Sequence, residues 1–163
     1  MTKIESDIVK ILQDDARATV SHIATILSLS EDEVSKIIEK LENSGVIVKY
    51  GAIVNEDEFF DDKVQALIEV KVNPMKEKGY DEIAEYLEQF SEVKNLYLMS
   101  GAYDLAIFIE GKNLKEVARF VSEKLSCINQ VLTVSTHFIL KKYKIEGVLT
   151  EKEDADYRLS IQA

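Results

Sequence analysis

Two groups of side chains in this sequence are able to bind a ligand, and the first is the polar face of a predicted helix. Ser35, Lys36 and Lys40 recur at helical spacing on the side away from the apolar positions, and Lys49 and Tyr50 follow the helix directly. Lysine ammonium groups bind phosphates and guanine edges, and a serine hydroxyl pairs with several base edges. These five residues are candidate DNA contacts. Each is also an ordinary residue for a solvated surface, and Tyr50 equally for a core.

The second group lies in the turn SGAYDL, residues 100–105. Gly101 stands between two predicted strands, where we expect a positive φ and a close approach of a ligand to the backbone. Exposed backbone N–H groups can hold a carboxylate, and Asp104 can hold an ammonium group. The turn could therefore bind both charged ends of an amino acid. It could equally be a tight hairpin in which Asp104 caps its own backbone, and the residues alone favour neither interpretation.

The first group is positioned by a helix whose two ends carry clear signals. Ser30 and Glu33 have the spacing of a capping box, and Gly45 supplies the left-handed residue that ends the helix. A shorter helix capped by Thr19 precedes it after a tight turn, and a first helix is predicted over 4–14. This is the pattern of a helix-turn-helix, whose last helix has the size to lie in a DNA major groove.

Extended segments and a polar stretch follow the three helices. Residues 46–48 and 52–54 predict a short strand pair or one bent strand, as in a winged-helix-like unit. The tail beyond residue 144 adds an edge strand, around 157–161, reaches across to a neighbouring subunit, or is disordered. The chain is therefore divided into a helix-turn-helix DNA-binding domain, a linker, an effector-binding and dimerisation domain, and a C-terminal tail: 1–54, 55–63, 64–144 and 145–163.

The second group is positioned by strands and amphipathic helices. Ala66, Ile68, Val70 and Val72 alternate with polar neighbours as one strand. The pattern beyond them predicts a helix, two strands, a helix and a last strand, over 79–90, 93–99, 103–110, 113–125 and 131–140. The order βαββαβ predicts a ferredoxin-like antiparallel sheet with both helices on one face, so the fold class is α+β.

The other face of that sheet needs a cover. In the strand 131–140, apolar or mixed side chains that can pack against a neighbour point to both faces. Leu132, Val134 and Thr136 lie on one face, and Thr133 and Ser135 lie on the other. A second copy of the same sheet is the simplest cover, so we expect a homodimer. Two tethered DNA-binding domains bind far more tightly than one.

The net charge is unusual for a DNA-binding protein. The 163 residues carry 20 Lys and Arg against 30 Asp and Glu, a net charge of −10, whereas phosphate contacts normally dominate affinity for DNA. The acids concentrate in residues 56–90, and the first 55 residues carry only a mild excess. We therefore expect weak DNA binding per subunit.

Several classes of protein and site are disfavoured by composition and spacing. No apolar run approaches the ~20 residues that cross a bilayer, so we expect no membrane partner. A single cysteine, Cys127, excludes an intrachain disulfide and fits the cytoplasm. No set of His, Cys, Asp or Glu has metal-ligand spacing, so we expect no metal and no cofactor.

The segments ILQDDAR, HIATILSLS and KLENSGVI resemble the N-terminal DNA-binding domain of the Lrp/AsnC (leucine-responsive, or feast/famine) family of transcription regulators. SGAYDLAIFIEG, followed by VLTVSTHFILKKYK, resembles the amino-acid-sensing domain of that family. The resemblance covers nearly the whole chain. It implies a sequence-specific regulator of double-stranded DNA that senses an amino acid or related small metabolite and forms dimers that often stack into octamers.

The resemblance also places the 100–105 turn at the contact between dimers that forms the effector pocket. It therefore favours the ligand-binding interpretation of the turn. The candidate effector-binding residues are Met99, Gly101, Tyr103, Asp104, Thr133, Ser135 and Thr136.

The predicted DNA-binding helix departs from the family pattern. The family usually carries an arginine where this chain has Ile37, and the acids of residues 31–33 repel phosphates. This departure supports an alternative, a metabolite-sensing or oligomeric scaffold protein with weak or no DNA binding. A siroheme decarboxylase-like enzyme is a third candidate, because Lrp-like chains include such enzymes. Such an enzyme needs polar and basic residues around a large planar substrate. Because Arg17, Arg119 and Arg158 are the only arginines, we expect no enzyme.

Overall fold

The computed structural model describes residues 1–55, 63–73 and 79–150. The chain forms two compact units, Met1–Val54 and Asn55–Ala163. Most of the predicted linker and the predicted strand near 157–161 lie outside the described residues.

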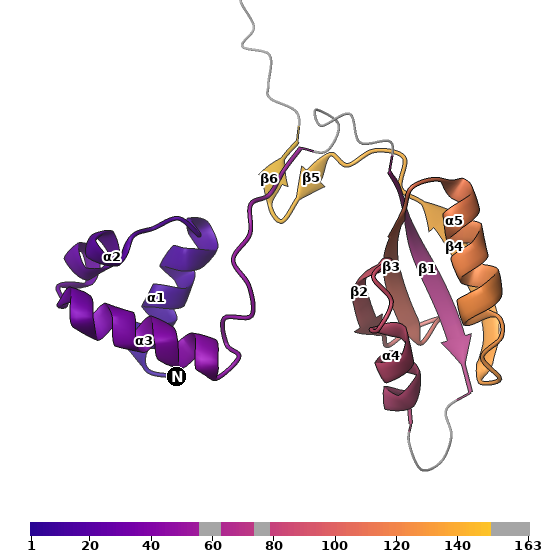
Figure 1. Cartoon of the computed structure of the whole chain (residues 1–163), viewed down its shortest axis with the longest axis horizontal. Coiled ribbons are helices and arrows are strands. Elements are labelled where there is room, and N and C mark those ends of the chain that lie inside the picture. The colour runs from indigo at the N-terminus through magenta and orange to yellow at the C-terminus, as the bar shows by residue number, and fades with distance from the viewer. Residues whose placement is uncertain (56–62, 74–78, 151–163) are drawn as a thin grey trace, which may run out of the picture. The chain divides into compact units, whose positions relative to one another are not determined.

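The N-terminal unit is built from three helices (Figure 1): α1 Lys3–Asp14, α2 Val20–Leu27 and α3 Glu31–Asn43. Their apolar sides meet in one core, which consists of Ile8, Leu12, Ile23, Ala24, Val34 and Leu41. The predicted three-helix arrangement is confirmed, with each predicted helix within a residue or two of its observed bounds.

The predicted end signals of α2 and α3 are present as hydrogen bonds. The backbone N–H of His22 donates to Thr19 Oγ1 at 3.2 Å, which caps α2. In α3, the backbone N–H of Ser30 donates to Glu33 Oε2 at 2.9 Å and that of Glu33 donates to Ser30 Oγ at 3.3 Å. At the other end Gly45 has a φ of +72°, the left-handed conformation predicted for it.

A capping box at the start of α1 also joins this helix to α3. The backbone N–H of Thr2 donates to Glu5 Oε2 at 2.6 Å, and the N–H of Glu5 donates to Thr2 Oγ1 at 3.2 Å. The other oxygen of Glu5 accepts from Lys40 Nζ of α3 at 2.6 Å. The lysine and the Thr2 amide together lower the pKa of Glu5 to about 2.

The predicted strand pair after α3 is wrong. No strand is described over residues 46–54. The N–H groups of Val46 and Ile47 both donate to the carbonyl of Leu41, at 3.0 and 3.1 Å, so the chain closes the end of α3 before it extends. Val48 is 89% exposed, and the rest of this unit is helical, so its described part offers no strand to pair with.

The C-terminal unit contains the predicted βαββαβ order. Its elements are β1 Val64–Val72, α4 Asp81–Leu87, β2 Val93–Leu98, β3 Leu105–Gly111, α5 Leu114–Phe120, which continues as the π-helical turn η2 Val121–Leu125, and β4 Val131–Phe138. The strands form one antiparallel sheet in the order β2-β3-β1-β4, the ferredoxin-like arrangement. The predicted fold class is therefore confirmed.

Both helices cover the same face of this sheet (Figure 1). The predicted inward residues of β1 are all buried, and they share one core with residues of β3 and the helices, including Ile107, Ile83, Leu87, Val117 and Phe120. The opposite face carries the alternate residues of each strand. We call it the open face and define it by Leu67, Glu69 and Lys71 of β1, Tyr97 of β2, Ala106 and Phe108 of β3, and Thr133, Ser135 and His137 of β4.

The predicted facing of β4 is right over most of its length and wrong at its start. A register shift occurs beside Lys71 and Val72, so that Val72 pairs with Val131 while Lys71 pairs with Thr133. Leu132 is the extra residue of this bulge. It has no partner in the register with β1 and does not follow the predicted alternation. Beyond β4, the strands β5 Lys144–Ile145 and β6 Val148–Leu149 form a small hairpin at the start of the predicted tail.

We predict that Gly45→Ala destabilises the end of α3. An L side chain in the left-handed region costs about 1–2 kcal/mol, so the α3 amides should exchange hydrogen several-fold faster. Gly51→Ala is the matched control, because Gly51 does not have a left-handed φ and an added Cβ there meets nothing within 4 Å. Equal exchange rates in the two variants would contradict the assignment.

We also predict that Glu5 stabilises the N-terminal unit in a pH-dependent way. Its folded-state pKa of about 2 lies below the ordinary value of 4.5, so the stabilisation is complete above about pH 5 and is lost as the pH falls towards 2. Glu5→Gln should therefore flatten the acid side of the unfolding curve of this unit. Exposed Glu39→Gln, on α3, should leave the curve as in the wild type.

Candidate nucleic-acid interface and ligand site

Four of the five candidate DNA contacts are on the exposed surface of the N-terminal unit without a buried partner. Ser35 and Lys49 are exposed. Lys36 Nζ lies 2.6 Å from Asp32 Oδ2 within α3, and the two side chains are 72% and 78% exposed. Tyr50 donates its hydroxyl hydrogen to Glu42 Oε1 at 2.8 Å, and partial burial together with this carboxylate raises the pKa of Tyr50.

Lys40 is in a different environment. Its ammonium group contacts Glu5 of α1, whose side chain is only 9% exposed, while Lys40 itself is 69% exposed. Glu5 is the one charged residue that is buried in the described part of the chain. Sequence reasoning did not single it out. The Thr2-x-x-Glu5 spacing could have predicted the capping box, but no sequence signal predicts the contact with a lysine 35 residues away.

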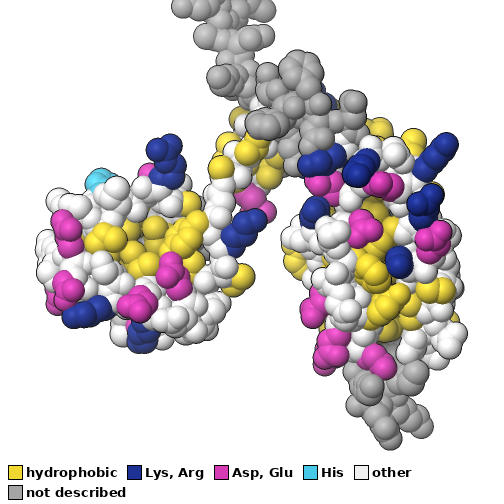
Figure 2. Space-filling view, viewed as in Figure 1, with side chains coloured by type: hydrophobic (Ala, Val, Ile, Leu, Met, Phe, Trp, Pro, Cys, Tyr) yellow, Lys and Arg dark blue, Asp and Glu magenta, His cyan; other side chains and the backbone are white. Residues whose placement is uncertain are grey.

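Acidic and basic side chains are interspersed on the N-terminal unit. Figure 2 shows magenta and dark blue side chains alternating around the visible face of this unit. Five of the nine acidic residues of this unit belong to α3, where Asp32 contacts Lys36 and Glu42 contacts Tyr50. Any DNA phosphate that approaches these groups therefore competes with a carboxylate of the protein.

In the second candidate site, Asp104 is held by its neighbours. Its Oδ2 accepts from the backbone N–H of Val72 at 2.9 Å, and Tyr80 donates to its Oδ1 at 3.4 Å. Its backbone carbonyl accepts from the N–H of Met99 at 2.8 Å, which closes the turn between β2 and β3. Asp104 therefore bridges three strand ends and does not cap only its own turn.

The positive φ expected at Gly101 is wrong. Gly101 is not in the left-handed region, and an added Cβ would meet no atom within 4 Å. The turn closes instead through the Asp104 contacts and through Lys71 Nζ, which donates to the carbonyl of Ala102 at 3.2 Å. Gly101 thus leaves open space beside the backbone, and it is not required by the turn geometry within one chain.

The remaining candidate effector residues divide between two faces of the sheet. Met99 is 40% exposed and Tyr103 is partly buried beside the turn. Thr133 and Ser135 pair with Lys71 and Glu69 on the open face. Thr136 pairs with Ile68 and so lies on the face that the helices cover. The structure brings Met99, Gly101, Tyr103 and Asp104 together in one turn, whereas Thr136 points away from Ser135 and Thr133.

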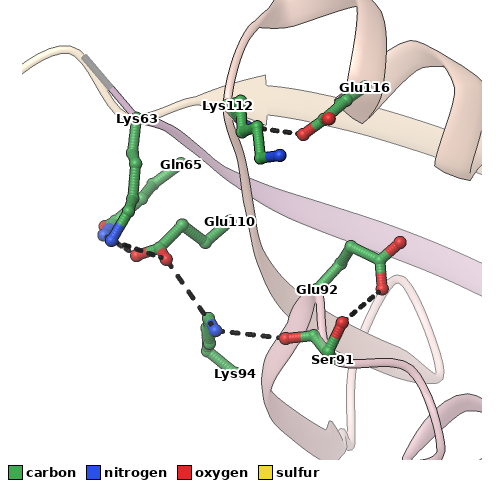
Figure 3. Close-up of polar contacts among 8 residues, drawn as sticks. All are labelled: Lys63, Gln65, Ser91, Glu92, Lys94, Glu110, Lys112 and Glu116. Carbon is green, nitrogen blue, oxygen red and sulfur yellow. Dashed lines mark hydrogen bonds and ion pairs between the residues drawn. The ribbon is translucent and has the colours of Figure 1, made fainter. Parts of the chain in front are cut away.

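Charged groups surround one end of the open face (Figure 3). Glu110 Oε1 lies 3.4 Å from Lys63 Nζ and 3.8 Å from Lys94 Nζ, and Gln65 donates to Glu110 Oε2 at 3.2 Å. Lys94 also donates to the carbonyl of Ser91. Nearer the middle of the face, His137 Nε2 lies 3.4 Å from Glu69 Oε2. Charged side chains therefore lie at one end of the open face and also on β1 and β4, beside Leu67 and Phe108.

Metal-ligand clusters and membrane-spanning helices are both absent from the described residues. In that part of the chain, no three His, Cys, Asp or Glu side chains are grouped as metal ligands would be. Over the same residues, no helix combines the length and the apolar character needed to cross a bilayer.

Comparisons with known proteins match both units. Residues 1–48 match the winged helix-turn-helix DNA-binding model, and residues 65–149 match the Lrp/AsnC ligand binding domain. The HTH-type transcriptional regulator YugG of Bacillus subtilis (strain 168) is 43% identical over 162 residues, which cover 99% of this chain and 98% of YugG. The HTH-type transcriptional regulator FL11 of Pyrococcus horikoshii is 34% identical over 144 residues, 88% of this chain and 92% of FL11.

Solved structures share the fold. The transcriptional regulator NMB0573 from Neisseria meningitidis, in complex with L-Met, superposes with a TM-score of 0.70 at 21% identity, over 89% of this chain and 93% of that one. The matched families and relatives are transcriptional regulators and not enzymes, which removes the support for a decarboxylase. With a DNA-binding unit at its N-terminus and a ligand-binding domain after it, the chain belongs to the Lrp/AsnC family of HTH-type transcriptional regulators.

Proposed function

We propose that this regulator places α3 in the major groove of double-stranded DNA and adjusts that binding when its C-terminal domain takes up an amino acid. The observation that carries the first part is the exposed face of α3, with Ser35 and Lys36 on a helix capped at both ends. At 13 residues, α3 is about 20 Å long, and the major groove admits a single α-helix.

In this proposal Lys36 supplies a phosphate or base contact, and Lys49 and Tyr50 lie where the chain leaves α3 and contact the DNA backbone. The Lys36–Asp32 pair does not prevent this role. Both side chains are largely exposed, and an exposed pair at i,i+4 spacing contributes only about 0.3–0.5 kcal/mol. A DNA phosphate can therefore replace Asp32 at little cost.

We predict that Lys36→Gln weakens binding to a labelled duplex taken from upstream of the regulator's own gene. The loss of one phosphate contact from each DNA-binding unit should lower the magnitude of the slope of log K against log salt by about 0.9 per unit, or about 1.8 for the proposed dimer. Exposed Lys115→Gln, in the C-terminal unit, has the same change in net charge and should keep the wild-type slope. If neither the wild type nor any variant retards this duplex at low salt, with or without amino acids, the scaffold alternative replaces the DNA-binding proposal.

The turn at residues 99–104 is the proposed amino-acid site. Asp104 is held in place by the strong bond from Val72, while the contact of its Oδ1 with Tyr80 is long at 3.4 Å. That oxygen can accept an ammonium group, and the open space at Gly101 lets a carboxylate approach the backbone. The complex of NMB0573 with L-Met supports an amino acid as the ligand class.

We predict that at least one of the twenty amino acids, with L-Met as the first probe, raises the melting temperature of the full chain, because a ligand bound to the folded state stabilises it. Asp104→Asn keeps the shape of the side chain and should reduce the shift. Exposed Glu85→Gln on α4 is the matched control and should show the wild-type shift. If no amino acid shifts the melting temperature, the assignment of this site is abandoned or moved to another class of metabolite.

We further propose that a second copy of the chain covers the open face, which gives a homodimer, and that dimers stack into octamers through the 99–104 turn. Tyr97 on this face is 50% exposed, and it packs edge-on against Phe108 with ring centroids 6.0 Å apart. Aromatic residues are enriched in protein interfaces, so this pair favours a partner on the open face. We also propose that the protein is located in the cytoplasm and binds no metal or cofactor.

A further inference from the structure

The two lysines on the exposed face of α3, Lys36 and Lys40, are paired with carboxylates in different environments. Lys36 contacts Asp32, which is itself 78% exposed and belongs to the same helix. Lys40 contacts Glu5, whose side chain is 9% exposed and comes from another helix. Both Nζ–O distances are 2.6 Å, so the two pairs differ in the burial of the carboxylate and not in the length of the contact.

The carboxylate of Glu5 cannot turn away from Lys40 without losing a second bond. Its Oε2 accepts from the backbone N–H of Thr2 at 2.6 Å, while Oε1 accepts from Lys40. The two oxygens are thus occupied by two different elements of the fold. If a phosphate drew Lys40 away, a partly desolvated carboxylate would be left without its counter-charge, which is unfavourable. By contrast, Asp32 returns to water when Lys36 leaves it.

We propose that Glu5 takes the place of a DNA phosphate at Lys40, so that each N-terminal unit makes one phosphate contact fewer than its lysines would allow. This inference rests on the proposed function, in which α3 faces the DNA. It makes Glu5 a residue that sets affinity without touching DNA. Because the pKa of Glu5 is about 2, the contact persists across the physiological pH range and is a constant feature of the unit.

A consequence follows for how the regulator finds its sites. Phosphate contacts add affinity for any DNA sequence, whereas base contacts distinguish sequences. Holding Lys40 lowers the affinity of a single unit for all DNA, so stable binding depends more on two units acting together. This arrangement agrees with the acidic surroundings of α3, where Asp32 and Glu42 also contact candidate DNA-binding groups.

The test measures the salt dependence of DNA binding by the full chain, using fluorescence anisotropy with the labelled upstream duplex. Glu5→Gln removes the charge but keeps a side chain that can complete the capping box with Thr2. It should bind more tightly and steepen the slope of log K against log salt by about 0.9 for each DNA-binding unit, or about 1.8 for the proposed dimer, so that its advantage over the wild type shrinks roughly twelvefold between about 50 and 200 mM salt.

Three further variants make the result specific to the contact. Lys40→Gln alone should keep the wild-type slope, because Lys40 makes no phosphate contact in the wild type. The double variant Glu5→Gln with Lys40→Gln, whose net charge equals that of the wild type, should lose the gain of Glu5→Gln. Asp7→Asn, which removes an acid from the same helix α1, should not steepen the slope.

Two outcomes would overturn the inference. One is a Glu5→Gln protein that is folded by circular dichroism and binds with the wild-type slope. The other is a Lys40→Gln protein whose slope falls as much as that of Lys36→Gln, which would mean that Lys40 already contacts DNA. The second outcome decides the question even if Glu5→Gln does not fold. Failure of the wild type to bind the duplex is a separate result, which removes the proposed function itself.

Discussion

Among the described residues, helices cover only one face of the four-stranded sheet, and this asymmetry leaves the other face open to a partner. Both helices pack on the face that carries Ile68 and Ile107, and the other face carries Phe108 of β3 and Tyr97 of the edge strand β2. Burying apolar surface is the main favourable term in folding and association, so a face of this composition favours a partner. The proposed dimer would join two DNA-binding units, and two tethered units bind DNA more tightly than one.

Features set by local sequence were predictable. The capping box of Ser30 and Glu33 and the left-handed Gly45 act within a few residues, and each has a narrow set of residues that satisfies it. The strand Val64–Val72 was predictable for a similar reason, since Ala66, Ile68, Val70 and Val72 place apolar side chains at every second position. The order of the elements then restricts the topology to the ferredoxin-like one.

Features set by distant contacts were not predictable from the sequence. Residues 46–54 have the composition of a strand, but a strand also needs a neighbour, and the described part of the unit supplies none. Gly101 suggested a left-handed turn, whereas contacts between the turn and β1, from Val72 to Asp104 and from Lys71 to Ala102, close the turn without one. The Glu5–Lys40 contact spans 35 positions, and no periodicity encodes it. The sequence was sufficient to list the candidate contact residues. It did not show which of them are already bound by another side chain of the protein.

The proposed homodimer uses the open face of the sheet as the interface between two copies of this chain. Sedimentation equilibrium of the full chain at neutral pH, over a wide range of concentrations, measures this association without a label or a ligand. We expect a mass of twice that of the chain or a multiple of it, which persists on dilution into the low micromolar range. A folded protein that sediments as a single chain at every concentration would show that the open face has no such partner.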